Sequence, residues 1–275
     1  LTTLVIPRVV IPEFVVKWMK TSQLTVIPPF LNRQPDMAPL FAQVLPEMKQ
    51  LRSLTLDWYV NPITSELQEV GWFASILQEC TQLTQLELTF AQHEVPLITQ
   101  ALAKLPGLVD LSLYCHPVTD IPPAFYDLRF PFLTRFESGW MIAKSGLPAL
   151  AGWLELHEGL TDLQLYFATA ECVQRSWDIL FQLPALETLS VWCHGYRGHA
   201  FHFQHWPTTL RKLKFNNGLV STFSLPDDHM LTHFQLETFD NNIIRHQTLV
   251  DLHTDWFHSF WPKEVLEPRA ILPDY

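Results

Sequence analysis

One hexapeptide pattern, Leu-x-x-Leu-x-Leu with close variants, returns along most of this chain. Its copies begin at eight leucines: Leu51, Leu83, Leu108, Leu133, Leu160, Leu186, Leu210 and Leu231. Successive copies begin 21 to 32 residues apart. Such a period is typical of chains that stack one structural unit on the next, because a single unit cannot bury its own apolar face. The pattern therefore predicts a solenoid, and it leaves open what the solenoid binds.

Within each copy, apolar residues alternate with polar ones. In the copy that begins at Leu83, the apolar Leu86, Leu88 and Phe90 fall on one side of an extended strand, with polar residues on the other side. Four further copies alternate in the same way, those at Leu51, Leu108, Leu160 and Leu186. The alternation is weaker in the copies at Leu133, Leu210 and Leu231. Each copy predicts a strand with one buried face and one solvent-facing face.

Between the strands, the apolar spacing changes to the three and four residues of a helix. We expect helices over 66–80, from Pro96 onward, around Trp177 and over 38–49, the last interrupted at Pro46. Ser65 and Gln68 predict a capping box at the start of the first helix. In the second helix we expect four side chains to point inward, those of Leu97, Ala101, Leu102 and Leu105.

This succession of strand, turn and helix resembles the leucine-rich-repeat family over about Leu51 to Leu236, and matches it poorly at both ends. The segments 77–83 and 111–120 look like the cysteine-containing repeats of F-box substrate receptors, although the F-box segment itself is not present in the sequence. The Asn or Cys ladder of the family is also largely missing. The resemblance implies an α/β fold: a leucine-rich-repeat solenoid with a parallel β-sheet on the concave side, and helices and loops on the convex side.

The repeat pattern divides the chain into three segments. We expect irregular N-terminal repeats over 1–50, where prolines are frequent, and the leucine-rich-repeat core over 51–248. Residues 249–275 are the expected C-terminal cap and tail. The aromatic run 256–262 breaks the repeat there, and a solenoid needs its terminal core covered.

The solvent-facing strand positions of a solenoid usually line its binding surface. Here they predict an acidic strip with aromatic neighbours and a basic step beside it. The predicted partner-binding residues are Asp57, Glu87, Asp110, Tyr114, Glu137, Asp162, Tyr166, Trp192, Lys212 and Lys214. Charges that merely keep a sheet soluble explain the acids equally well. Exposed Tyr and Trp favour a protein interface, because these residue types dominate interface energies. We therefore expect a protein partner that presents basic groups.

Composition limits the other classes of partner. The formal charge of 18 − 28 = −10 disfavours nucleic-acid binding, which needs a cationic surface. Since no apolar run reaches the length of a membrane span, we expect no membrane contact. The four cysteines contain no C-x-x-C pair and are expected to be small core residues in a reducing compartment: Cys80, Cys115, Cys172 and Cys193. These features predict a cytoplasmic protein.

A histidine-rich insert covers residues 192–207. His199, His202 and His205 lie three residues apart beside a cysteine, and neutral imidazole and thiolate are good zinc ligands. The spacing matches no established zinc motif, and the aromatic residues of the insert favour a loop packed over the core. We expect a structural loop or a contact patch, with a metal site as the less favoured alternative, and no cofactor.

No motif for nucleophilic hydrolysis, zinc hydrolysis, phosphate binding or dinucleotide binding occurs in the sequence. We therefore expect a non-enzymatic protein–protein interaction module that binds its partner on the concave surface. The F-box resemblance implies substrate recognition for a ubiquitin ligase as one form of this function. Two other classes remain open because fold alone does not decide between them. They are a sensor or effector repeat domain in an immune or host–microbe setting, and an architectural subunit of a larger complex.

Overall fold

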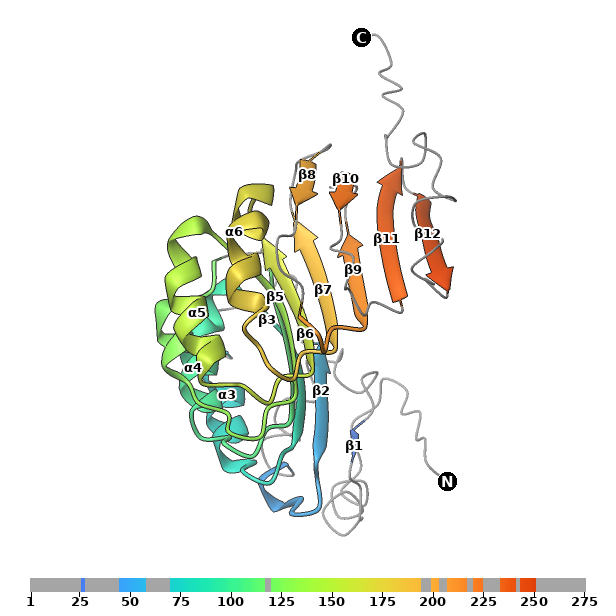
Figure 1. The fold of residues 1–275 in the computed structure, drawn as a ribbon. Helices are drawn as coiled ribbons and strands as arrows, with labels where there is room; N and C mark the ends of the chain where they lie inside the picture. Colours follow the sequence, from blue (N-terminus) through green and yellow to red (C-terminus); the bar gives the residue numbers. More distant parts are fainter. Residues whose placement is uncertain are drawn as a thin grey trace, which may run out of the picture. The chain divides into compact units, whose positions relative to one another are not determined.

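The computed structural model describes nine stretches of the chain: 26–27, 45–57, 70–116, 120–193, 199–202, 207–216, 220–224, 233–240 and 243–250. They belong to two compact units, 1–140 and 141–275. Each unit is an α/β structure: parallel strands alternate with helical elements through the N-terminal unit and as far as β7 (Thr188–Cys193) in the C-terminal unit, where the described elements after β7 are strands (Figure 1). None of the helices in these stretches is long and apolar enough to cross a membrane.

The N-terminal unit contains a parallel sheet whose strands follow one another in chain order. Its strands are β1 (Val26–Ile27), β2 (Ser53–Asp57), β3 (Gln85–Ala91), β4 (Asp110–His116) and β5 (Arg135–Ile142), the last of which continues two residues past the unit boundary at Trp140. Each strand pairs with the next one along the chain. The register places the buried side chains Leu54, Leu86, Leu111 and Phe136 in one row across the sheet. The strand positions predicted from the leucine spacing are therefore confirmed in β2–β5.

Helices cover one face of this sheet, on the side where the leucines point (Figure 1). The helical elements are η3 (Leu45–Glu47), α3 (Val70–Glu79), η4 (Gln92–Glu94), α4 (Val95–Leu102) and η5 (Pro123–Asp127). Of the helix expected over 38–49, the described part is the short turn η3 at Pro46. The capping box expected at Ser65 lies outside the described residues.

The second expected helix is α4, and one of its predicted inward residues is wrong. Leu97 is 37% exposed, whereas Val95 and Ile98 are buried with Ala101 and Leu102. The helix begins at Val95, so its buried face passes through Val95, Ile98 and Leu102 at helical spacing. Leu97 lies about 200° around the helix from Val95 and therefore faces outward.

Aromatic side chains fill the core where η5 replaces an α-helix. The Phe125 ring lies 5.1 Å from the Trp140 ring and 5.7 Å from the Phe136 ring, measured between ring centroids. Trp140 also contacts Phe90 edge to face at 5.6 Å. Offset and edge-to-face contacts of this kind stabilise a core beyond simple burial. They hold β5 firmly against the helical layer through its inward side chains.

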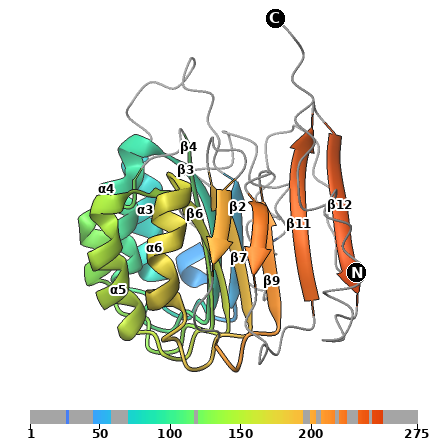
Figure 2. The same cartoon turned by 45° about the horizontal axis from the view of Figure 1, so that its top comes forward.

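The C-terminal unit contains the remaining described elements. They are η6 (Lys144–Gly146), α5 (Leu147–Glu155), β6 (Asp162–Phe167), α6 (Ala170–Leu180), β7 (Thr188–Cys193), β8 (His199–His202), β9 (Lys212–Asn216), β10 (Val220–Ser224), β11 (His233–Asp240) and β12 (Ile243–Val250). Strands β6, β7, β9 and β11 pair in parallel, and β12 adds to β11 in the antiparallel direction (Figure 2). A separate parallel pair joins β8 and β10.

Several features of this unit differ from the expectations. The helix expected around Trp177 is α6, with Thr169 as its N-cap, but α5 and the hairpin of β11 and β12 were not predicted. The histidine-rich insert, expected to be a loop, contains β8. Within the segment expected as cap and tail, the described residues are the last two of β12, and the rest lies outside the description. The prediction that the cysteines are core residues is confirmed, since all four side chains are buried.

The aromatic core of the N-terminal unit gives a direct test. Phe125 is 0% exposed and Phe132, seven residues later, is 64% exposed. We expect Phe125→Ala to lower the free energy of unfolding by about 3–5 kcal/mol through loss of burial and creation of a cavity. The matched control Phe132→Ala should change it by less than about 0.5 kcal/mol. Urea unfolding followed by circular dichroism measures both, and equal effects would contradict this packing.

Candidate functional site

The candidate site lies on the face of the N-terminal sheet that points away from α3 and α4, here called the helix-free face. Because side chains alternate along a strand, the residues next to the buried leucines point to this face. Thr55, Glu87, Ser112 and Glu137 pair in register across β2 to β5 and form one row, here called the open row. A second row on the same face contains Ser53, Gln85, Asp110 and Arg135. The parallel register therefore brings together residues from four copies of the sequence pattern.

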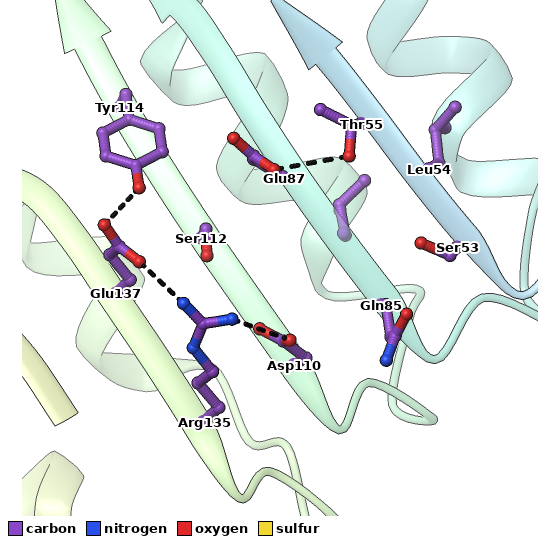
Figure 3. Close-up of a pocket in the computed structure, with 11 residues that line it drawn as sticks. Ser53, Leu54, Thr55, Gln85, Glu87, Asp110, Ser112, Tyr114, Arg135 and Glu137 are labelled. Carbon is purple, nitrogen blue, oxygen red and sulfur yellow. Dashed lines mark hydrogen bonds and ion pairs between the residues drawn. The ribbon is translucent and has the colours of Figure 1, made fainter. Parts of the chain in front are cut away.

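Arg135 connects the two rows through a pair of ionic contacts (Figure 3). Its Nη1 lies 3.3 Å from Asp110 Oδ2, and its Nη2 lies 3.1 Å from Glu137 Oε2. Exposed ion pairs of this type contribute only about 0–1 kcal/mol each to folding. Their main effect is to fix the orientation of both carboxylates, because the guanidinium is planar and its N–H groups point in set directions.

Tyr114 holds the same glutamate from the other side. Its hydroxyl donates a hydrogen bond to Glu137 Oε1, as Figure 3 shows. The tyrosine has space to lie across β5 because residue 139 is a glycine. A Cβ added at Gly139 would lie 2.9 Å from Tyr114 Cδ1, closer than two carbon atoms normally approach. The aromatic ring thus covers a bare stretch of the neighbouring strand, an arrangement that shields glycine in sheets.

Burial has a clear effect on the Tyr114 hydroxyl. Desolvation, the hydrogen bond to Glu137 and the negative charge of that carboxylate together raise the pKa of Tyr114 well above its usual value. The phenol therefore stays protonated and remains a hydrogen-bond donor throughout the physiological pH range. Both oxygens of Glu137 are consequently engaged, one by Tyr114 and one by Arg135.

A depression of about 250 Å³ opens on the helix-free face among these residues. Its lining is Ser53, Leu54, Thr55, Gln85, Leu86, Glu87, Asp110, Ser112, Tyr114, Arg135 and Glu137 (Figure 3). Ser112 is the smallest side chain of the open row between two glutamates, so the surface is low at that point. Glu87, on the opposite side from Glu137, accepts a hydrogen bond from Thr55 at 3.3 Å. The depression is thus lined by carboxylates in fixed positions around a short hydroxyl side chain.

Four of the predicted site residues meet in this depression: Glu87, Asp110, Tyr114 and Glu137. The Asp57 backbone belongs to β2, but its side chain lies outside the description. Sequence reasoning missed Arg135 and Ser112, so the strip is not purely acidic. The sequence pattern could have identified both residues. Arg135 holds the third place of its copy, as Asp110 does, and Ser112 holds the fifth place, as Glu137 does.

The other predicted residues belong to the C-terminal unit. Tyr166 pairs with Trp192 on neighbouring strands, and both side chains are partly exposed. Lys212 and Lys214 of β9 pair in register with Thr188 and Ser190 of β7. Asp162 lies at the start of β6, and its register row passes through Thr188 to Lys212. The row of Tyr166 and Trp192 continues to Asn216, so the predicted aromatic residues and the predicted lysines lie in different register rows of this unit.

The histidine-rich insert is described only in part. His199 and His202 are the first and last residues of β8, and His205 lies outside the description. In the described stretches, no group of three or more His, Cys, Asp or Glu side chains is arranged to hold a metal ion. Among the cysteines, burial raises the pKa of the Cys80 thiol to about 11, so this side chain is a neutral core residue at physiological pH.

A scan against protein-family models gave no match to the chain, and a search of curated proteins found no similar sequence.

The buried phenol of Tyr114 predicts a pH effect. Its pKa in the folded protein lies above the value of about 10 in an unfolded chain, so the unfolded chain loses this proton first as the pH rises. The contribution to stability is therefore present below about pH 10 and is lost above it. We expect the free energy of unfolding to fall more steeply between about pH 9 and 11 in the wild type than in Tyr114→Phe.

Urea unfolding at several pH values measures this difference. Tyr126, whose pKa is also raised by burial, is present in both proteins and cancels in the comparison. If the free energy of unfolding depends on pH in the same way in both proteins, folding does not raise the pKa of Tyr114 and the prediction is wrong.

Proposed function

We propose that this chain is a leucine-rich-repeat solenoid and acts as a non-enzymatic protein-interaction module. In this proposal the partner protein binds on the helix-free face of the N-terminal unit. The recurrent leucine pattern, the parallel strands in register and the helices confined to one face of the sheet support the repeat architecture. In the described part of the N-terminal unit, no helix lies on the opposite face of the sheet, which favours that face as the binding surface.

The observation that carries the proposal is the ordered polar array around the depression. Arg135 fixes Asp110 and Glu137, Tyr114 fixes Glu137 again, and Thr55 fixes Glu87. Binding normally loses free energy when mobile side chains become ordered at the interface. Side chains that are already held in place reduce this loss, which favours recognition of a partner over a purely solubilising role.

The charges of this array favour a basic partner. Glu87, Asp110 and Glu137 place three carboxylates around the depression, and Arg135 supplies one positive charge. Complementary charge raises the rate of encounter and selects the correct partner. The array offers no activated nucleophile, since no described histidine or carboxylate accepts a hydrogen bond from Ser112. This supports a binding role rather than catalysis.

Charge reversal on the helix-free face tests the proposal. We expect Glu87→Arg to reduce capture of specific partners at least about tenfold in affinity purification with quantitative mass spectrometry, because a like charge would oppose the basic partner. Glu79→Arg makes the same charge change at an exposed position on α3 and should leave capture unchanged. Equal capture by wild type and both variants would rule out this face. Copurification of a cullin-adaptor protein would support the ubiquitin-ligase form of the function, and its repeated absence would count against it.

The aromatic pair of the C-terminal unit allows a separate test of partner binding. We expect Tyr166→Ala and Trp192→Ala each to weaken binding of the captured partner by about 1–4 kcal/mol, because partly exposed Tyr and Trp are common interface anchors. Isothermal titration calorimetry measures the affinity, with Phe132→Ala as the control for loss of an exposed aromatic ring elsewhere. Unchanged affinity in both variants would exclude this pair from the interface.

A further inference from the structure

Ser112 is the most unusual residue of the open row. It is only 6% exposed, yet its hydroxyl makes no hydrogen bond with the other described residues. Its Oγ is not sealed in the core, since Ser112 lines the depression, so the hydrogen-bond partner of this hydroxyl must come from water or from a bound group. Ser112 lines the depression on the helix-free face, between Glu87 and Glu137 (Figure 3). A bound group that occupies the depression would give this hydroxyl its partner.

Two further acceptors surround Ser112. Glu87 accepts the Thr55 hydroxyl with Oε2, which leaves Oε1 available. Asp110 contacts Arg135 with Oδ2, which leaves Oδ1 available. Glu87 is the register neighbour of Ser112, and Asp110 lies two residues before it on the same face of β4. Three acceptor oxygens, from Glu87, Ser112 and Asp110, therefore border the same small space.

We propose that this depression binds one primary ammonium group, supplied by a lysine side chain of the partner protein. An ammonium group has three N–H donors, which matches the three available oxygens of Glu87, Ser112 and Asp110. The inference rests on the proposed function, since it identifies which basic group of the partner enters the helix-free face. It adds the position of that group and the residues that recognise it.

The contacts already present favour lysine over arginine. A guanidinium binds best to a carboxylate that offers both oxygens side by side. Glu137 has both oxygens engaged, and Glu87 and Asp110 each have one oxygen engaged. A second guanidinium would have to displace Thr55 or Arg135, whereas an ammonium uses single oxygens from separate residues. Anions are disfavoured because three carboxylates surround the space and the guanidinium of Arg135 already contacts two of them.

The width of the depression also fits a single side chain. Glu87 and Glu137 flank Ser112 on adjacent strands, so their Cα atoms are about 10 Å apart. This gap admits one extended lysine chain. The methylene groups of that chain would pack over the ring of Tyr114, which is held beside the gap by Glu137 and Gly139.

The test uses the full chain and blocked amino acids as probes, with affinities from NMR titration. Nα-acetyl-lysine methylamide should bind with a Kd of about the millimolar range, as expected for one charged group with a few hydrogen bonds. Its Nε-trimethyl derivative keeps the charge but lacks every N–H donor, and should bind at least about tenfold more weakly. Nα-acetyl-arginine methylamide should also bind more weakly. Norleucine methylamide, whose only ammonium is the α-amine, distinguishes a chain terminus from a side chain and should bind more weakly as well.

Matched variants locate the site. Ser112→Ala should weaken lysine-probe binding about tenfold without loss of stability, because it removes a hydroxyl that has no protein partner. Glu87→Gln should have an effect of similar size, and Glu79→Gln on α3 should have none. Unfolding curves of the variants show whether each one is folded.

Each outcome decides the inference in one direction. Tighter binding of the lysine probe, lost in Ser112→Ala and Glu87→Gln, supports it. Equal binding of the trimethyl or arginine probe, tighter binding of norleucine methylamide, or full affinity in folded Ser112→Ala would overturn it. If the lysine probe fails while partner capture still depends on Glu87→Arg, only the ammonium site is wrong. If capture is also insensitive to Glu87→Arg, the proposed interaction surface is wrong too.

Discussion

The parallel register of the N-terminal sheet is the constraint on which the candidate site depends. Leu54, Leu86, Leu111 and Phe136 form one buried row, so the next residue on each strand must fall in one row on the opposite face. A shift of one residue in any strand would expose its leucines, and burial therefore fixes the register strongly. The same apolar contacts that stabilise the core thus position Thr55, Glu87, Ser112 and Glu137. The polar site needs little stabilisation of its own.

The aromatic core explains why β5 can carry the most interconnected part of the site. Phe136 and Trp140 contact Phe125 on the helix side of this strand. Between them, Glu137 and Gly139 face the other way and meet Arg135 and Tyr114. Packing on one side limits movement of the strand, and hydrogen bonds on the other side limit rotation of the glutamate. The core contacts and the site contacts therefore lie on opposite faces of the same strand, β5.

The sequence predicted the buried strand positions well and the longer-range features poorly. Alternation is a local property, so Leu86, Leu88 and Phe90 could be placed from their spacing alone. Leu97 is the exception: its spacing groups it with Ala101, but the buried face of α4 is centred on Val95, Ile98 and Leu102, which leaves Leu97 at the exposed margin. The antiparallel pairing of β11 with β12 depends on contacts between strands, to which a repeat pattern gives no guide.

The site was predicted in part for a similar reason. Glu87, Asp110, Tyr114 and Glu137 were found by their place in the repeat, and the register then brought them together. Arg135 holds an equivalent place but was overlooked, since an acidic strip was inferred from acidic residues alone. The role of Gly139 depends on the direction of the Tyr114 ring, which the spacing of residues along one strand does not specify.

Arg135 also determines which ligand charge the surface favours. Without it, Asp110 and Glu137 would repel each other across neighbouring strands, and one of them would tend to turn away. The guanidinium keeps both carboxylates oriented, yet it supplies only one positive charge against the three carboxylates around the depression. The remaining charge is concentrated on the side of Ser112 and Glu87, away from Arg135. An internal cation therefore strengthens, rather than cancels, the preference for an external one, because it fixes acceptor oxygens that would otherwise move apart.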